Sequence, residues 1–125
     1  AVLLLPMKRI TLVLLSLLFA GSLFADALET ARAEIDRQSK LIKKGDAKGL
    51  KARLTERQRA RVTAAVVKKA KKELSGYTLD DLVESVEEGE YQGQKTIKIK
   101  MKNGRTLTTL VEINGQWYAD TIWFR

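Results

Sequence analysis

The sequence predicts an α+β fold in which N-terminal helices pack in a curved antiparallel sheet. Three observations predict it. Apolar residues recur at helical spacing up to about residue 76, and from about residue 95 they alternate with polar residues. Asn-Gly dipeptides at 103–104 and 114–115 then separate the alternating runs, as expected at hairpin turns. Helices and strands in separate halves of a chain are typical of helices covering one sheet face.

The first 25 residues have the pattern of a secretory signal peptide. Lys8 and Arg9 precede an apolar run over residues 10–20, which is shorter than the ~18–20 residues needed to span a bilayer. Cleavage after Ala25 and cleavage after Ala27 both fit the small-residue rule. Residues 1–6 precede Met7 and are interpreted as lying upstream of the true start. The alternative for the whole stretch is a membrane anchor or a buried N-terminal helix.

Cleavage leaves residues 26–125, which are enough for a single α+β domain with one hydrophobic core. The chain contains no cysteine, which excludes a lipid-modified N-terminus, cysteine metal ligands and thiol nucleophiles. An export signal without disulfides favours a bacterial periplasmic or extracellular protein. We expect no stable membrane span after cleavage.

The expected helical half opens with one long amphipathic helix. Leu28, Ala31, Ile35 and Ile42 share one face, and polar residues occupy the rest. Gly45 suits the C-terminal cap of this helix. The narrow apolar stripe predicts that one side of the helix docks against the domain core.

Shorter helices are expected to follow. Asp46 can cap a helix over residues 47–54, and Thr55 with Gln58 forms the capping-box pattern "TERQ". Thr63 can cap a helix over residues 64–74, which Gly76 ends. The helices should therefore be connected tightly.

The remaining residues predict a meander of about four strands. Thr78 and Asp81 can close one capped turn, after which residues 82–91 extend as the first strand. The run "TIKIKMK" then places Ile97, Ile99 and Met101 on one side and lysines on the other. This alternation is typical of a half-buried antiparallel strand with a solvated outer face.

The first Asn-Gly turn allows two registers. A two-residue loop pairs Lys102 with Arg105. The apolar residues of the two strands would then lie on opposite faces of the hairpin. A three-residue loop with Gly104 in a bulge unites the apolar faces, and we prefer it. Its expected pairs are Met101 with Arg105, Ile99 with Leu107, and Ile97 with Thr109.

The second Asn-Gly turn decides which side chains of the last strand face inward. With a two-residue loop, Tyr118 opposes Val111 and Asp120 opposes Thr109, on the apolar face. With a three-residue loop, that face receives the alternate set Trp117, Ala119, Thr121 and Trp123. The sequence leaves both registers open.

Charge is divided unevenly between the two halves. The net charge is +8 over residues 26–76 and −2 over residues 77–125. No aromatic residue lies among the basic ones to stack on bases, so we expect no nucleic acid partner. The basic half could instead contact anionic polymer of a cell envelope, although lysines near helix ends also complement the helix dipole. Arg53 and Arg57 belong to this half, and the principal candidates for that contact are Lys43, Lys44, Lys48, Lys51, Lys68 and Lys72.

The segment "KKGDAKGLKARLTE", the two Asn-Gly hairpins and the ending "NGQWYADTIWF" resemble the nuclear-transport-factor-2-like superfamily, also called SnoaL-like or, broadly, cystatin-like. The likeness is to its small exported bacterial members of unknown function. It covers nearly all of residues 26–125 and implies a cone-shaped α+β barrel with a pocket at its open end. It also implies a homodimer through the outer sheet face.

The residue types limit the chemistry. The chain has no histidine, which excludes a histidine-dependent dehydratase and a Ser-His hydrolase. We expect no metal, because histidine and cysteine, the usual transition-metal ligands, are both lacking. We also expect no cofactor. An isomerase- or dehydratase-like enzyme would need Asp120 as base and Tyr118 as donor.

We therefore expect a non-catalytic exported module that binds a small hydrophobic ligand, or a partner through its sheet face. Envelope binding and the Asp120–Tyr118 enzyme are the alternatives. The aromatic-rich ending supplies most of the expected ligand-binding residues. These are Trp117, Tyr118, Asp120, Trp123 and Tyr91.

Overall fold

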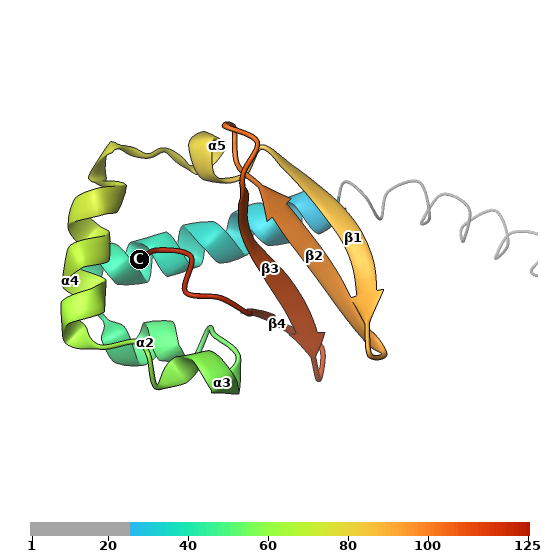
Figure 1. The fold of residues 1–125 in the computed structure, drawn as a ribbon, viewed down its shortest axis with the longest axis horizontal. Coiled ribbons are helices and arrows are strands. Elements are labelled where there is room, and N and C mark those ends of the chain that lie inside the picture. Colours follow the sequence, from blue (N-terminus) through green and yellow to red (C-terminus); the bar gives the residue numbers. More distant parts are fainter. Residues whose placement is uncertain (1–25) are drawn as a thin grey trace, which may run out of the picture.

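The computed structural model describes residues 26–125, and the predicted signal peptide lies outside them. The fold is α+β, with helices on one face of a four-stranded antiparallel sheet (Figure 1). A long N-terminal helix covers residues 26–44. The shorter helices are α2 (Ala47–Lys51), α3 (Glu56–Arg59), α4 (Ala64–Glu73), the 3-10 helix η1 (Leu74–Gly76) and α5 (Leu79–Leu82).

The sheet is a meander in the order β1-β2-β3-β4. Its strands are β1 (Ser85–Tyr91), β2 (Gln94–Lys100), β3 (Thr106–Ile113) and β4 (Gln116–Ala119). The predicted fourth strand is therefore confirmed. The sheet is not closed, because β1 and β4 are its two edges, and a cone-shaped barrel is not shown. At the β4 edge, Leu54 makes a parallel bridge with Ala119.

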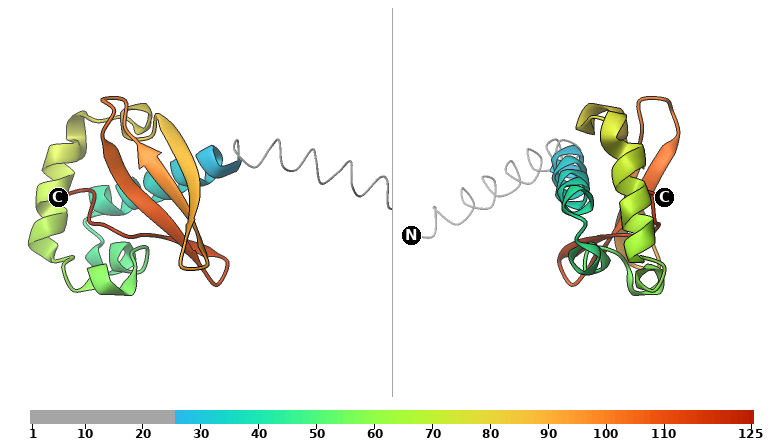
Figure 2. Two further views of the ribbon diagram at one scale, coloured as in Figure 1. Left: turned by 45° about the vertical axis from the view of Figure 1, so that its right-hand side comes forward. Right: turned by 90° about the vertical axis from the view of Figure 1, so that its left-hand side faces the viewer.

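The helices and the sheet form two layers. Figure 2 shows the N-terminal helix lying along one face of the sheet, with α4 crossing at one end. The C-terminal residues leave β4 and run back between α4 and the sheet (Figure 1). The core lies between the layers, and its largest buried apolar side chains are Phe124, Ile35, Ile42, Leu50, Leu54, Ile99 and Leu110.

Most of the predicted helix ends are confirmed. Gly45 adopts the left-handed conformation at the end of the N-terminal helix, with φ +71°. The Asp46 side chain accepts a hydrogen bond from the Gly49 amide, and Thr63 caps α4 in the same way. Thr78 and Asp81 form a reciprocal capping box on α5.

The capping box predicted at Thr55 is wrong. Thr55 precedes α3 but makes no side-chain cap, because its hydroxyl donates instead to Asp120 Oδ1 at 2.8 Å. The Gln58 amide donates to the main-chain oxygen of Asp120 at 2.9 Å. Both side chains of the motif thus tie α3 to the end of β4.

The first hairpin is predicted correctly at its turn and wrongly beyond it. The Met101 amide donates to the Arg105 carbonyl at 2.7 Å, as the three-residue loop requires. A bulge at Leu107 then shifts the register, so that Ile99 opposes Thr108 and Ile97 opposes Leu110. The inner face of β3 is therefore made by the even-numbered residues.

The second hairpin has the two-residue loop, and Tyr118 opposes Val111 as that register requires. Asn114 and Gly115 have φ of +53° and +78°, the left-handed pair that a type I′ turn needs. The inward facing of Tyr118 that the sequence predicts for this register is nevertheless wrong. The Leu107 bulge has already reversed the faces of β3, so Ala119 is buried inside opposite Leu110.

Candidate functional site

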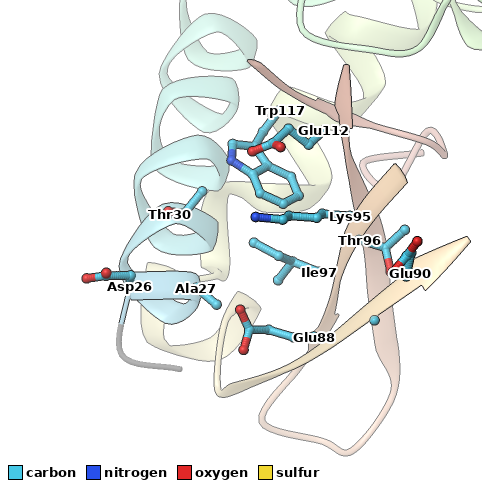
Figure 3. A pocket seen from close by; sticks show the side chains of 11 residues that line it. Asp26, Ala27, Thr30, Glu88, Glu90, Lys95, Thr96, Ile97, Glu112 and Trp117 are labelled. Atoms are coloured by element: carbon cyan, nitrogen blue, oxygen red, sulfur yellow. The ribbon is translucent and has the colours of Figure 1, made fainter. Parts of the chain in front are cut away.

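A groove opens between the N-terminal helix and the inner face of the sheet (Figure 3). Its volume is about 540 Å³, within the range of small-molecule sites. The helix contributes residues one turn apart, including Ala27 and Thr30. The sheet contributes Glu88 from β1, Lys95 and Ile97 from β2, Glu112 from β3 and Trp117 from β4.

Strand register explains why these side chains meet. Glu88 opposes Ile97 and Glu112 opposes Trp117, and alternate residues share a face. Ile97 is buried, so its neighbours on the same face also point toward the helix. Figure 3 shows Glu88, Lys95 and Trp117 projecting from the sheet toward the N-terminal helix.

The floor of the groove is apolar. Ala27 and Ile97 are 4% and 2% exposed, and both pack in the core. Trp117 is half-buried against the same core and presents the remainder of its indole to the groove. A ligand placed here would therefore contact an aromatic ring on one side and aliphatic carbon beneath it.

The walls of the groove carry an excess of negative charge. Four carboxylates and one ammonium line it, namely Asp26, Glu88, Glu90, Glu112 and Lys95. None of these five forms an ion pair with another residue in the described part of the chain. Their charges are therefore available to a ligand.

A second hollow of about 470 Å³ adjoins the groove and shares Thr30 and Trp117 with it. Glu34 is among its lining residues; it is 3% exposed and binds Arg53 and Arg37. The Glu34 carboxylate raises the pKa of Arg53 above its usual value, chiefly by accepting its hydrogen bonds. One wall of the second hollow is thus held by an ion-pair cluster.

Gln38 connects that cluster to the C-terminal segment. Its side chain is fully buried; it donates to Glu34 Oε2 at 2.9 Å and accepts from Trp123 Nε1 at 2.8 Å. Trp123 also meets Phe124 edge to face, with ring centroids 5.4 Å apart. Trp123, expected in the ligand site, therefore holds the C-terminal segment to the N-terminal helix.

The other expected site residues lie on the outer face of the sheet. Asp120 and Tyr91 line a separate hollow of about 210 Å³, and Tyr118 projects from β4 on the same side. Asp120 is bound by Arg57 and Thr55, and this carboxylate raises the pKa of Arg57 through its hydrogen bonds. Nothing in this geometry supports Asp120 and Tyr118 as a catalytic pair facing the helices.

The six candidate lysines for an anionic surface are all exposed. They come from the end of the N-terminal helix, from α2 and from α4, which gather at the end of the molecule away from β1 (Figure 1). Arg53 and Arg57, from the same basic half, are engaged by Glu34 and Asp120. The basic end and the acidic groove thus lie at opposite ends of the fold.

Sequence reasoning found Trp117 but missed the groove residues around it. Glu88 follows Val86 by two positions, Lys95 precedes Ile97 by two, and Glu112 follows Leu110 by two. The period of two already places Glu88 and Lys95 on the inner face, and it places Glu112 there once the Leu107 bulge is known. Gln38 could have been found from the helical stripe, because it lies between Ile35 and Ile42 at spacings of three and four.

Within residues 26–125, no group of three or more carboxylate, histidine or cysteine side chains is placed to hold a metal ion. No helix of the same residues combines the length and apolar character needed to cross a bilayer. Comparison with protein-family models, curated proteins and solved structures finds no match to the chain. The resemblance to the nuclear-transport-factor-2-like superfamily stays a prediction.

Proposed function

We propose that this chain is an exported, non-catalytic binding module that holds a small amphipathic amine in the groove beside Trp117. The observation that carries the proposal is the pairing of an indole and an aliphatic floor with carboxylates that have no ion-pair partner among the described residues. An ammonium group on the ligand would lie near Glu88 and Glu112. Its apolar part would contact Trp117 and Ile97.

Two physical arguments favour an amine over a neutral or anionic ligand. Carboxylates outnumber the single ammonium of Lys95 in the groove, so the local potential attracts cations. An aromatic face also attracts a cation by about 0.5–2 kcal/mol. The groove lacks histidine and cysteine, so histidine-dependent and thiol-based catalysis are excluded there.

A series of matched probes tests this function. Phenethylamine, 2-phenylethanol and 3-phenylpropionate share an aromatic ring and differ in charge. Titration calorimetry on the purified protein should give the tightest binding for phenethylamine and the weakest for 3-phenylpropionate. Of the three probes, only phenethylamine should bind more weakly when the salt concentration is raised, since its attraction is electrostatic. Equal affinity for all three, or preference for the carboxylate, would overturn the proposal.

A second candidate function rests on the basic end of the molecule. Six exposed lysines on three helices could hold the exported protein against anionic polymer of the envelope, and none of the six lines the groove. Retention on a teichoic-acid or lipopolysaccharide matrix should then fall steeply with salt. Retention that does not change between low and high salt would exclude it.

The homodimer through the outer sheet face is proposed on the half-exposed apolar residues of that face. Val111, Ile113 and Tyr118 are half-buried there, and Tyr91 is 68% exposed. Sedimentation equilibrium tests it. A dimer that dissociates on Tyr91→Glu supports this interface, and a monomer at all concentrations excludes it. Such a dimer would leave the groove open, because the groove is on the inner face.

A further inference from the structure

Another cleft lies at the basic end, between the N-terminal helix and the turn that joins α4 to α5. Its volume is about 440 Å³, and it shares no lining residue with the groove beside Trp117. The N-terminal helix contributes Ser39, Ile42 and Lys43. The opposite wall is formed by residues from Lys71 to Leu82.

The interior of this cleft is largely aliphatic. Ile42 and Leu82 are buried, and Leu74 and Leu79 are half-buried against the core. Tyr77, at the same cleft, is 50% exposed although it is a large apolar side chain. A hydrocarbon chain in the cleft would cover these surfaces.

The polar groups that line the cleft divide into two sets. Asp36, Ser75 and Thr78 have partners within the fold, namely Lys40, the Lys72 carbonyl and the Asp81 amide. Lys43 and Lys71 are exposed and form no ion pair with another described residue.

Ser39 also belongs to the set of polar groups that have no partner within the fold. Its hydroxyl is the buried side-chain polar atom in residues 26–125 that has no hydrogen-bond partner. A buried hydroxyl without a partner is unfavourable. Ser39 and Lys43 are four residues apart and so adjoin on the helix surface. The charged groups of the cleft that have no ion-pair partner among the described residues are therefore both ammonium groups.

We propose that this cleft binds a single-chain anionic amphiphile, such as a medium-chain fatty acid. Its head lies near Lys43 and Lys71, and it accepts a hydrogen bond from Ser39 once that buried hydroxyl turns toward the cleft. Its chain packs against Leu74, Leu79 and Leu82. Two ammonium groups without ion-pair partners select an anionic head, and the aliphatic wall selects a hydrocarbon chain.

Calorimetric titration of the purified protein with decanoate, decyl phosphate, decanol and decyltrimethylammonium tests the inference. The two anions should bind more tightly than decanol, and the cation should bind most weakly. Comparing decanoate with decyl phosphate distinguishes a fatty acid from a phosphorylated lipid as the source. Equal binding of all four ligands, or binding of none, would overturn the proposal.

Lysine variants locate the site. Lys43→Gln and Lys71→Gln should each raise the Kd of decanoate by about 2- to 5-fold, the range for an exposed charge pair. Lys68→Gln and Lys72→Gln are matched controls on α4 that do not line the cleft, and they should leave the Kd unchanged. An equal loss in both pairs would show diffuse attraction to the basic end and would contradict a built site.

Ser39→Ala separates recognition from stability. Removing a hydroxyl without a partner should leave the melting temperature of the free protein unchanged or raise it, and should still raise the Kd of decanoate. An unchanged Kd removes Ser39 from the site. Decanoate affinity that responds to Trp117→Leu instead would place the ligand in the other groove and overturn the inference.

Discussion

Glu112 and Trp117 oppose each other across the β3–β4 ladder, and both side chains point toward the N-terminal helix (Figure 3). A carboxylate thus lies on the same face as an indole, at the mouth of a groove with an aliphatic floor. This pair combines the two attractions that an amine with an apolar group would use.

Trp117→Leu should therefore weaken the binding of phenethylamine more than the binding of its neutral analogue, 2-phenylethanol. Leucine keeps apolar contact but removes the aromatic face, so the Kd of phenethylamine should rise by roughly 2- to 30-fold. The Kd of 2-phenylethanol should rise less. Titration calorimetry of both probes gives the comparison, and an equal rise for both would show that the indole acts only as an apolar surface.

The buried contact between Gln38 and Trp123 predicts a loss of stability. Gln38→Leu leaves the Trp123 N–H without its acceptor and Glu34 without one donor, which should lower the free energy of unfolding by about 1–3 kcal/mol. Trp123→Phe removes the other partner. Chemical denaturation of both single variants and the double variant measures the coupling. Additive losses would contradict a direct hydrogen bond between them.

Asp81 predicts a stability change in acid. In the fold its pKa lies below its usual 3.8, first because the Thr78 amide donates to the carboxylate, then because of the Thr78 side chain and Lys102. A lowered pKa adds stability above pH 3.8, and this stability is lost as the pH falls through the folded value.

The stability difference between wild type and Asp81→Asn should accordingly be full at pH 6 and shrink below pH 3.8. Chemical denaturation across that range measures it. Asp80→Asn is the neighbouring control, because Asp80 binds Arg32 at the surface and no backbone amide among the described residues. A difference for Asp81→Asn that stays constant down to pH 2 would contradict the capping box.

The turn between β3 and β4 predicts the effect of a glycine substitution. Gly115 has φ +78°, where a side chain is strained, so Gly115→Ala should lower the free energy of unfolding by about 1–2 kcal/mol. Gly76→Ala is the control. Gly76 has free space around it and no left-handed φ, and it should tolerate alanine with no loss. Thermal unfolding of the two variants makes the comparison, and equal stability would argue against the type I′ turn.

Much of the fold could be predicted because local chemistry determines it. Helix caps depend on residues close together in the sequence. The side chains of Asp46, Thr63 and Thr78 each accept a hydrogen bond from the amide three residues later, and Gly45 supplies a left-handed φ. Thr55 shows where prediction from local sequence fails. The same hydroxyl can cap a helix or bind a distant carboxylate, and contact with Asp120 decides between them.

The β3 and β4 residues of the site could be predicted less well because one bulge determines which face they occupy. A single extra residue at Leu107 moves every later side chain of β3 and β4 to the opposite face. Trp117 therefore points inward despite the two-residue turn, and Tyr118 points outward. Glu88 and Lys95 can be recognised as groove residues only when the position of the N-terminal helix opposite them is known.

The affinity for phenethylamine in charge variants of the groove tests the central claim most directly. Glu88→Gln combined with Glu112→Gln should raise the Kd by about 5-fold or more, and Lys95→Gln should lower it, because each change alters the potential in the groove. Glu87 lies beside Glu88 on β1 but on the outer face of the sheet, so Glu87→Gln should leave the Kd unchanged. Equal effects of Glu87→Gln and Glu88→Gln, or no effect of any of these changes, would contradict an amine site beside Trp117.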